Sequence, residues 1–292
     1  SEVESDLSSL TEKYGPNCTV KNGVVSNISQ HFFAAYFIRD VHPIYVPGQG
    51  LNLYETETGL WRKQTKEQMI KAISESIFRF SNQYKVPELV LKRNARLCKD
   101  ILAFVEGECK TDDPFSQRKG YFIHCRNGML VWQEESQKFT LEPFSPDFYS
   151  RNRCEFNYEP TKKCPRFLSE LIHPAMSDDD AAVIQQYGGQ ILLGRNITQM
   201  LLILSGTAGG GKSTLVSLIE QVIGEGNFCE LRTKELEGRF ETNRFTGKTL
   251  LCGKDVRSTF LAQKGASAIK RLTGGDRMTT EVKCENGSFQ LR

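Results

Sequence analysis

The apolar residues in the first third of the chain recur at helical spacing in three stretches. Residues 28–38 place four aromatic side chains on one face, so we expect a helix there. Thr65 and Gln68 fit the capping-box pattern, and the apolar residues behind them predict a helix over 66–82. A proline at the start of residues 87–107, followed by apolar positions at helical spacing, predicts one further helix.

Short alternating stretches bounded by turn residues predict β-strands. Residues 51–54 and 59–61 are expected to pair as a hairpin, after a run of prolines and glycines over 43–50 that breaks any regular element. The Asn127-Gly128 pair is typical of a tight turn. It lies between the first two of three further predicted strands, which cover 121–124, 128–133 and 138–141.

The second half of the chain combines predicted helices with short apolar strands. Helices are expected from Pro165 and from the acidic run 178–180, which can cap the second of them. Residues 200–204 form a compact apolar run that predicts a strand. The apolar stripe over 215–223 predicts a helix closed by Gly224.

The length of 292 residues suggests roughly two domains of ordinary size. No internal repeat divides the chain, so the boundaries are placed where the periodicity changes. We predict a mostly helical region over 1–112, an α+β segment over 113–192 and a carboxyl-terminal domain over 193–292.

Composition narrows the class of protein. Hydrophobic residues make up 39% and charged residues 25%, which is typical of a globular chain and excludes a disordered or fibrous one. The longest apolar runs are far shorter than a membrane span, and no secretion signal begins the chain, so we expect a cytoplasmic protein without membrane partners, in the host cytoplasm if viral. A first residue Ser1 instead of Met is typical of a fragment or a processed product.

The nine cysteines show no Cys-x-x-Cys pair and no histidine at ligand spacing. We therefore expect reduced thiols and neither a structural zinc site nor a disulfide framework. The net charge of +3 conceals an asymmetry, because residues 193–292 carry 15 Lys and Arg against 10 Asp and Glu. The excess of positive charge there points to an anionic partner.

The segment that follows the 200–204 run carries the clearest chemistry. Residues 206–214 read Gly-Thr-Ala-Gly-Gly-Gly-Lys-Ser-Thr, which fits the phosphate-binding loop G-x-x-x-x-G-K-[ST]. Glycines allow successive backbone N–H groups to surround an anion at a helix amino terminus. Lys212 can reach the outer phosphates of ATP, and the Ser213 hydroxyl can bind Mg²⁺. The predicted nucleotide-binding residues are Gly206, Thr207, Ala208, Gly209, Gly210, Gly211, Lys212, Ser213 and Thr214. A glycine-rich turn without a ligand is the alternative, although a turn needs neither the lysine nor the hydroxyl.

A phosphate loop needs an acid on a neighbouring strand to organise metal and water. The best candidate is Asp255, which ends the apolar run 249–255 and would serve as a catalytic residue and a Mg²⁺ ligand. A surface aspartate at a strand end is the alternative. Glu230 and Glu241 are weaker candidates, because neither is predicted to end an apolar strand.

Beyond Asp255, the sequence predicts a short helix over 268–274, a glycine turn and a hairpin over 279–291. Basic residues outnumber acidic ones here, which suits a polyanion. A solvated edge hairpin protected by lysines is the alternative.

Several of these segments together resemble a known family. The phosphate loop, residues 239–251, Asp255 and the stretch Lys-Arg-Leu-Thr-Gly-Gly-Asp over 270–276 resemble the ATPase core of superfamily 3 helicases, in the branch of phage, plasmid and poxvirus-type primase-helicases. Upstream, four stretches are similar to the helicase-associated domain that precedes this core: 59–61, 127–130, 157–160 and 164–168.

The resemblance implies an α/β fold, namely a P-loop NTPase of AAA+ type with a three-layer sheet, preceded by a mixed α+β helicase-associated domain. It implies a homo-hexamer that hydrolyses Mg-ATP while a hairpin moves along single-stranded DNA at a replication fork, with a primase domain or protein as a further candidate partner. Lys212 and Asp255 would be catalytic. The DNA-contacting positions would be Lys270, Arg271, Arg277 and Lys283.

Two departures from the family pattern keep other functions open. Lys254 stands where many relatives have a second acid, and the chain stops at Arg292, before the family's sensor Asn and its trans-acting Arg finger. With Lys254 in that place, either Asp255 alone serves both metal and water or the chain hydrolyses ATP poorly. The missing sensor and Arg finger predict slow turnover. A non-catalytic, nucleotide-dependent DNA-binding or assembly module is the first alternative. A small-molecule kinase is the second, although no arginine-rich lid follows the loop.

Overall fold

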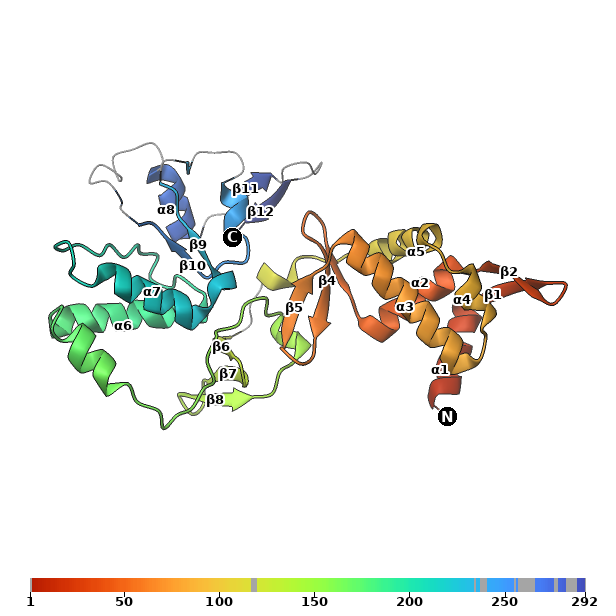
Figure 1. Cartoon of the computed structure of the whole chain (residues 1–292), viewed down its shortest axis with the longest axis horizontal. Helices are drawn as coiled ribbons and strands as arrows, with labels where there is room; N and C mark the ends of the chain where they lie inside the picture. The colour runs from red at the N-terminus through yellow and green to blue at the C-terminus, as the bar shows by residue number, and fades with distance from the viewer. Residues whose placement is uncertain are drawn as a thin grey trace. The chain divides into compact units, whose positions relative to one another are not determined.

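The computed structural model describes residues 2–116, 120–233, 235–236, 241–254, 256, 266–275, 278–281 and 288–291. It is a mixed α/β structure of helices and small sheets (Figure 1). Its contacts divide the chain into two compact units. The first unit comprises Ser1–Glu55 and Trp61–Pro114, and the second comprises Thr56–Leu60 and Phe115–Arg292.

The first unit is built from helices with two small antiparallel sheets, β1-β2 and β3-β4-β5. Its elements are α1 (Glu2–Tyr14), β1 (Cys18–Lys21), β2 (Val24–Ile28), α2 (Gln30–Val41), β3 (Ile44–Val46), β4 (Gly50–Glu55), β5 (Leu60–Lys63), α3 (Lys66–Tyr84), α4 (Glu88–Lys92) and α5 (Ala95–Glu108).

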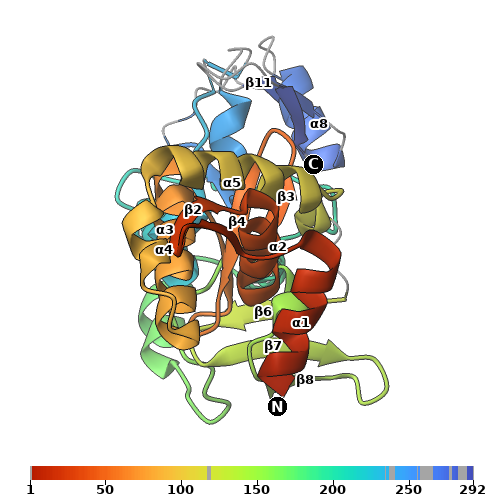
Figure 2. The same cartoon turned by 90° about the vertical axis from the view of Figure 1, so that its right-hand side faces the viewer.

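An aromatic cluster forms the core of the first unit, where α2 and α3 pack with α5 (Figure 2). The Phe80 ring from α3 lies within 5.6 Å of the rings of Phe32, Phe33 and Tyr36 from α2, centroid to centroid. Phe32, Phe33 and Phe80 are fully buried. Such edge-to-face packing contributes stability beyond the burial of apolar area.

The predicted helices of this unit are confirmed in part. The helix over 28–38 forms as α2, and the capping box of α3 is present, with Gln68 N–H bonded to the Thr65 hydroxyl at 3.2 Å. The single helix over 87–107 is wrong. The chain forms α4 and α5 instead, because Asn94 adopts an extended backbone and caps α5 by accepting from Leu97 N–H at 3.0 Å. The run 43–50 is not free of regular structure either, since it contains β3.

The second unit carries an antiparallel sheet, a parallel pair of strands and a hairpin, with helices among them. Its elements are η1 (Pro114–Ser116), β6 (Phe122–Cys125), β7 (Gly128–Gln133), β8 (Lys138–Glu142), η2 (Pro146–Phe148), the π-helix η3 (Phe167–Ile172), α6 (Asp178–Leu193), α7 (Lys212–Ile223), η4 (Glu225–Asn227), β9 (Phe228–Glu230), η5 (Thr242–Phe245), β10 (Leu250–Cys252), α8 (Ala266–Gly274), β11 (Met278–Glu281) and β12 (Ser288–Leu291).

The three strands predicted over 121–141 are confirmed as the antiparallel sheet β6-β7-β8. The loop that follows joins this sheet to α7. Cys154 N–H donates to the carbonyl of His124 in β6 at 2.8 Å, and Glu155 N–H donates to the carbonyl of Val222 near the end of α7 at 3.0 Å. These backbone bonds fix the carboxyl end of α7 relative to β6.

The cap of α6 differs from the prediction. The acidic run 178–180 lies inside the first turn, and the hydroxyl of Ser177 caps the helix by accepting from Asp180 N–H at 3.2 Å. The carboxylates still stabilise α6, because negative charge is favourable near a helix amino terminus.

The strand predicted over 200–204 is wrong, because this segment has no regular secondary structure. Gln190 in α6 holds its start, accepting from Thr198 N–H at 3.0 Å. Within the described ranges, the parallel sheet next to α7 consists of β9 and β10 alone, so the expected three-layer sheet is not formed there. An apolar run predicts burial, but a strand also requires a partner for its backbone groups.

Candidate functional site

The glycine-rich loop leads directly into α7, as expected from the sequence. Gly209 and Gly211 have φ angles of 76° and 79°, which favour glycine because a side chain would be strained there. Gly211 is the N-cap of α7 and offers no side chain to the first turn. The amino-terminal N–H groups of α7 are therefore not capped by a side chain, and such groups are suited to hold an anion.

Lys212 is the first residue of α7, and its side chain folds back over the loop. Its ammonium group donates to the carbonyl of Gly206 at 2.9 Å and to that of Thr207 at 2.7 Å. A backbone bond from Gly210 N–H to the Thr207 carbonyl, at 3.2 Å, tightens the same turn. The cation is thus held at the mouth of the loop, and it must exchange these carbonyls for phosphate oxygens if an anion enters.

The predicted residues 206–214 all lie in this loop and the first turn of α7. Ser213 follows Lys212 directly, so its hydroxyl belongs to the same helix end. A hydroxyl oxygen fits the preference of Mg²⁺ for oxygen ligands. In the described part of the chain no three His, Cys, Asp or Glu side chains gather as a metal site. Among the residues that the structure describes at this helix end, Ser213 is therefore the protein ligand available to a magnesium ion, alongside phosphate oxygens and water.

A cavity of about 390 Å³ opens beside the loop. Apolar side chains of η3 and α6 form one side of it, and residues 202–207 form another. Its polar lining includes Asp180, Ser205 and Lys212. This volume lies within the usual range for small-ligand sites. The cavity and the glycine loop share Gly206, Thr207 and Lys212, so a ligand that spans them would meet both an apolar wall and backbone amides.

Tyr187 of α6 fixes the wall made by residues 202–207. Burial raises the pKa of the Tyr187 hydroxyl, and a backbone hydrogen bond from Leu202 partly opposes that shift. The contact ties the apolar segment to α6. The segment that the sequence predicts as a strand thus serves as one side of the cavity.

The acidic candidates occupy different environments. Glu230 ends β9, so the expectation that it does not end a strand is wrong. Its side chain is exposed and pairs with Arg232 at 3.9 Å. Glu241 is buried and pairs with Arg244 at 2.5 Å. Asp255, the favoured candidate, lies outside the described residues.

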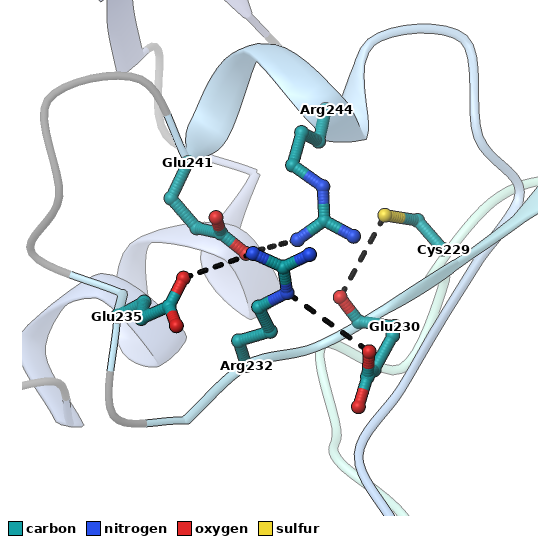
Figure 3. A network of polar contacts seen from close by, with 6 residues as sticks. All are labelled: Cys229, Glu230, Arg232, Glu235, Glu241 and Arg244. Carbon is teal, nitrogen blue, oxygen red and sulfur yellow. Dashed lines mark hydrogen bonds and ion pairs between the residues drawn. The ribbon is translucent and has the colours of Figure 1, made fainter.

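Both glutamates belong to a network of polar contacts at the end of β9, shown in Figure 3. Arg232 donates to Glu235 at 3.0 Å and also lies near Glu230. Glu241 is already neutralised by Arg244, so it is better placed to hold η5 than to activate water. Removing one partner of such a buried pair is costly.

Lys254 pairs with Glu220 of α7, with 3.3 Å between the ammonium nitrogen and a carboxylate oxygen. The Glu220 side chain is 12% exposed, so the attraction is only partly screened by water. The pair joins the residues after β10 to the helix that begins at the phosphate loop. The pair also affects the thiol of Cys252. Burial and the charge of Glu220 raise the pKa of Cys252, and Lys254 partly opposes that shift. Lys254, which departs from the family pattern, thus has its charge offset by an acid of α7.

The predicted DNA-contacting residues are placed only in part. Lys270 and Arg271 lie exposed on α8, whose Ala268 and Ile269 pack in the same apolar cluster as Cys229 and Leu231. The predicted hairpin is confirmed as β11 paired with β12, from Met278 opposite Leu291 to Glu281 opposite Ser288. Arg277 and Lys283 lie outside the described residues.

Two features of the site were missed by sequence reasoning. The first is the cavity wall, built from η3 and α6 residues such as Leu171 and Val183. Their helical spacing was visible, but spacing does not reveal which distant loop a helix faces. The second is the Glu220–Lys254 pair. A charged residue within the apolar stripe over 215–223 was the available signal for it.

The remaining expectations can be compared with the described residues. Their eight cysteines are all free of disulfides. None of their helices combines the length and hydropathy needed to cross a membrane.

Two family models match the chain. Residues 30–173, just under half of the chain, match the family described as D5 N terminal like. Residues 204–291 match a family of unknown function, DUF5906. The first match supports the primase-helicase family of phage and virus type, and with it a context of DNA replication.

Proposed function

We propose that the chain binds Mg-ATP at residues 206–214 and couples its hydrolysis to movement on single-stranded DNA, as a replicative helicase of a phage, plasmid or viral-type element. The observation that carries this proposal is the geometry of the loop. Left-handed glycines, an uncapped helix amino terminus and the ammonium of Lys212 converge on one small volume. All three features favour a bound phosphate chain.

The proposed roles rest on the geometry of the loop and, for Asp255, on its place in the sequence. Backbone N–H groups of the loop and of the first turn of α7 would donate to the phosphates. Lys212 would leave the carbonyls of Gly206 and Thr207 and neutralise the outer phosphates. Ser213 would hold Mg²⁺, and Asp255 would act as its second protein ligand and orient the attacking water. The apolar cavity beside the loop would take the nucleoside.

DNA would meet the carboxyl-terminal face of this unit. Lys270 and Arg271 are exposed on α8, which is followed by the β11-β12 hairpin. We assign Arg277 and Lys283 to the same surface by their place in the sequence. Exposed cations in the same unit as the nucleotide site would allow the contact with DNA phosphates to change with nucleotide state.

Assembly as a homo-hexamer belongs to the same proposal. Several apolar side chains near the loop are exposed, among them Met200 and Val183, and Ile203 is 61% exposed. Exposed apolar patches mark interaction surfaces. Sedimentation with and without Mg-ATP would measure the state of assembly, with a nucleotide-dependent hexamer expected and a monomer under both conditions contradicting it.

The first experiment is nucleotide binding by the full chain, measured by calorimetry with Mg-ATP. Lys212→Ala is expected to lower the affinity by at least about tenfold, because the main cation facing the phosphates is lost. Lys248→Ala is the matched control, since Lys248 also donates to a backbone carbonyl, that of Gly226, in the same unit. Equal binding by both variants would overturn the site.

The alternative is a non-catalytic module that binds nucleotide and DNA without turnover. The Lys254–Glu220 pair favours it, because it leaves a cation where a second acid would otherwise assist hydrolysis. Phosphate release separates the two functions. Turnover stimulated by single-stranded DNA and lost in Asp255→Asn supports the helicase, whereas tight binding without phosphate release supports the module.

A further inference from the structure

A basic surface lies on the first unit, where α4 is followed by α5. Between residues 89 and 99 the chain carries four cations and no acid. Lys92 ends α4, Arg93 links the two helices, and Arg96 and Lys99 follow on α5. We call the surface formed by Leu91, Lys92, Arg93, Arg96 and Lys99, together with Phe78 of α3, the α4–α5 corner.

The cations of this corner are not held in ion pairs within the part of the chain that the structure describes. None of the four forms an ion pair with any residue that the structure describes. Asp100 accepts from the Gln30 amide at 3.2 Å, and Glu88 opens α4 without an ion pair to Lys92 within the described ranges. Lys99 differs from the other three cations, because it interacts electrostatically with Glu67 at the start of α3. Arg96 and Lys99 are three residues apart and therefore lie on the same side of α5. The like charges of Lys92, Arg93 and Arg96 repel one another, so a bound anion would relieve a cost to the folded unit.

Arg93 is the ordered centre of the corner. Its guanidinium donates to the carbonyl of Ser74 at 2.8 Å and lies 5.3 Å from the centroid of the Phe78 ring. These two contacts hold the planar group in place before any ligand arrives. A pre-organised guanidinium loses less entropy on binding a phosphate than a free side chain does.

Apolar groups beside these cations narrow the class of ligand. Leu91 is 85% exposed and Phe78 is 44% exposed. A phosphate backbone alone would leave them in water, whereas unstacked bases would cover them. Cations interleaved with apolar and aromatic side chains are typical of surfaces that bind single-stranded nucleic acid. A duplex keeps its bases stacked inside and could not use them in this way.

We propose that the α4–α5 corner is a nucleic-acid contact of the first unit that binds the phosphates and bases of single-stranded DNA. Arg93 provides the fixed phosphate contact, Lys92, Arg96 and Lys99 provide further charge, and Leu91 contacts bases. This inference rests on the proposed function only for the choice of DNA as the strand. The corner lies outside the nucleotide site, so either assignment can fail without the other.

The test measures anisotropy of a labelled oligothymidylate of about 20 nucleotides with the full chain, without nucleotide and over a range of salt concentrations. Lys92→Ala/Arg96→Ala is expected to weaken binding by about tenfold at low salt. It should also reduce the slope of log K against log salt by about 1.4, because each phosphate contact to a single strand contributes about 0.7. Both side chains are exposed, so the variant should unfold at the same temperature as the wild type.

The matched control is Arg126→Ala/Lys138→Ala, which removes one arginine and one lysine from exposed positions of the second unit. It is expected to keep the wild-type slope. An equal loss in both double variants would show a general effect of net charge and overturn the proposal. An unchanged slope in Lys92→Ala/Arg96→Ala would overturn it too.

Two further measurements fix the class of partner. Leu91→Ser keeps the charge and should weaken binding by a few-fold at high salt, where phosphate contacts are screened. Unlabelled single strands should compete better than duplex DNA or vesicles containing phosphatidylserine. Vesicles that compete as well as single strands would overturn the assignment to nucleic acid. Retained Mg-ATP binding in the corner variant, with loss in Lys212→Ala, separates failure of this proposal from failure of the nucleotide site.

Discussion

The two units differ in how completely each buries its apolar residues. In the first, α2, α3 and α5 enclose a cluster of aromatic rings, and Phe32 and Phe80 have no exposed surface. In the second, α7 buries only Leu215 and Ile223, while several apolar residues near the phosphate loop are exposed. The first unit therefore has a well-packed core, whereas the region around the loop leaves apolar side chains in contact with solvent.

The largest effect is expected from Phe80→Ala. Removing a ring that packs against four others should cost about 3–5 kcal/mol of unfolding free energy, since the cavity cannot collapse among rigid rings. Leu215→Ala in α7 should cost about 2 kcal/mol, because fewer side chains surround that position. Urea unfolding, monitored by hydrogen exchange in each unit, measures the loss of stability in both variants. Equal costs would contradict the difference in packing.

A smaller effect should separate two glycines of the second unit. Gly211→Ala forces a side chain into the left-handed region at the start of α7 and should destabilise the protein by about 1–2 kcal/mol and weaken nucleotide binding. Gly188→Ala is its control. Gly188 lies within α6 with nothing within 4 Å of an added Cβ, so alanine should stabilise by up to about 1 kcal/mol.

Thermal unfolding of both glycine variants gives the sign of each change. No change with Gly211→Ala would show that the left-handed backbone of the loop does not constrain residue 211. Destabilisation by Gly188→Ala would contradict the gain expected from helix propensity.

The smallest effect is expected at alkaline pH, where each unit should lose stability through one buried thiol. Burial raises the pKa of the Cys109 thiol in the first unit and of the Cys125 thiol in the second to about 11, from about 9 in the unfolded chain. The folded protein then retains protons that the unfolded chain releases, so the stability that these thiols contribute is present below pH 9 and falls as pH rises towards 11.

The dependence of stability on pH would be measured from urea unfolding midpoints at pH values between 8 and 11, spaced about one pH unit apart. Cys109→Ala and Cys125→Ala should each make the slope shallower. A slope that neither substitution changes would mean that these thiols do not control alkaline unfolding.

The sequence predicted best where local signals and packing agree. The residues of the predicted helix over 28–38 form α2, and Thr65 and Gln68 form the predicted capping box. The Asn127-Gly128 turn lies between β6 and β7. It failed at Asn94, where a single capping side chain divides one periodic stretch into two helices. Periodicity describes a face, and it does not say where the backbone leaves the helix.

The glycines and the lysine of the 206–214 loop were readable because their chemistry depends on residue type and spacing along the chain. Their environment was not. Three features depend on contacts between distant parts of the chain. Residues 198–204 lie against α6 through Gln190 and Tyr187, η3 and α6 form the wall of a cavity beside the loop, and Glu220 offsets the charge of Lys254. Local interactions are encoded in neighbouring letters, whereas the partner of a side chain or a backbone group is chosen only when distant segments compete to bury apolar area and satisfy hydrogen bonds.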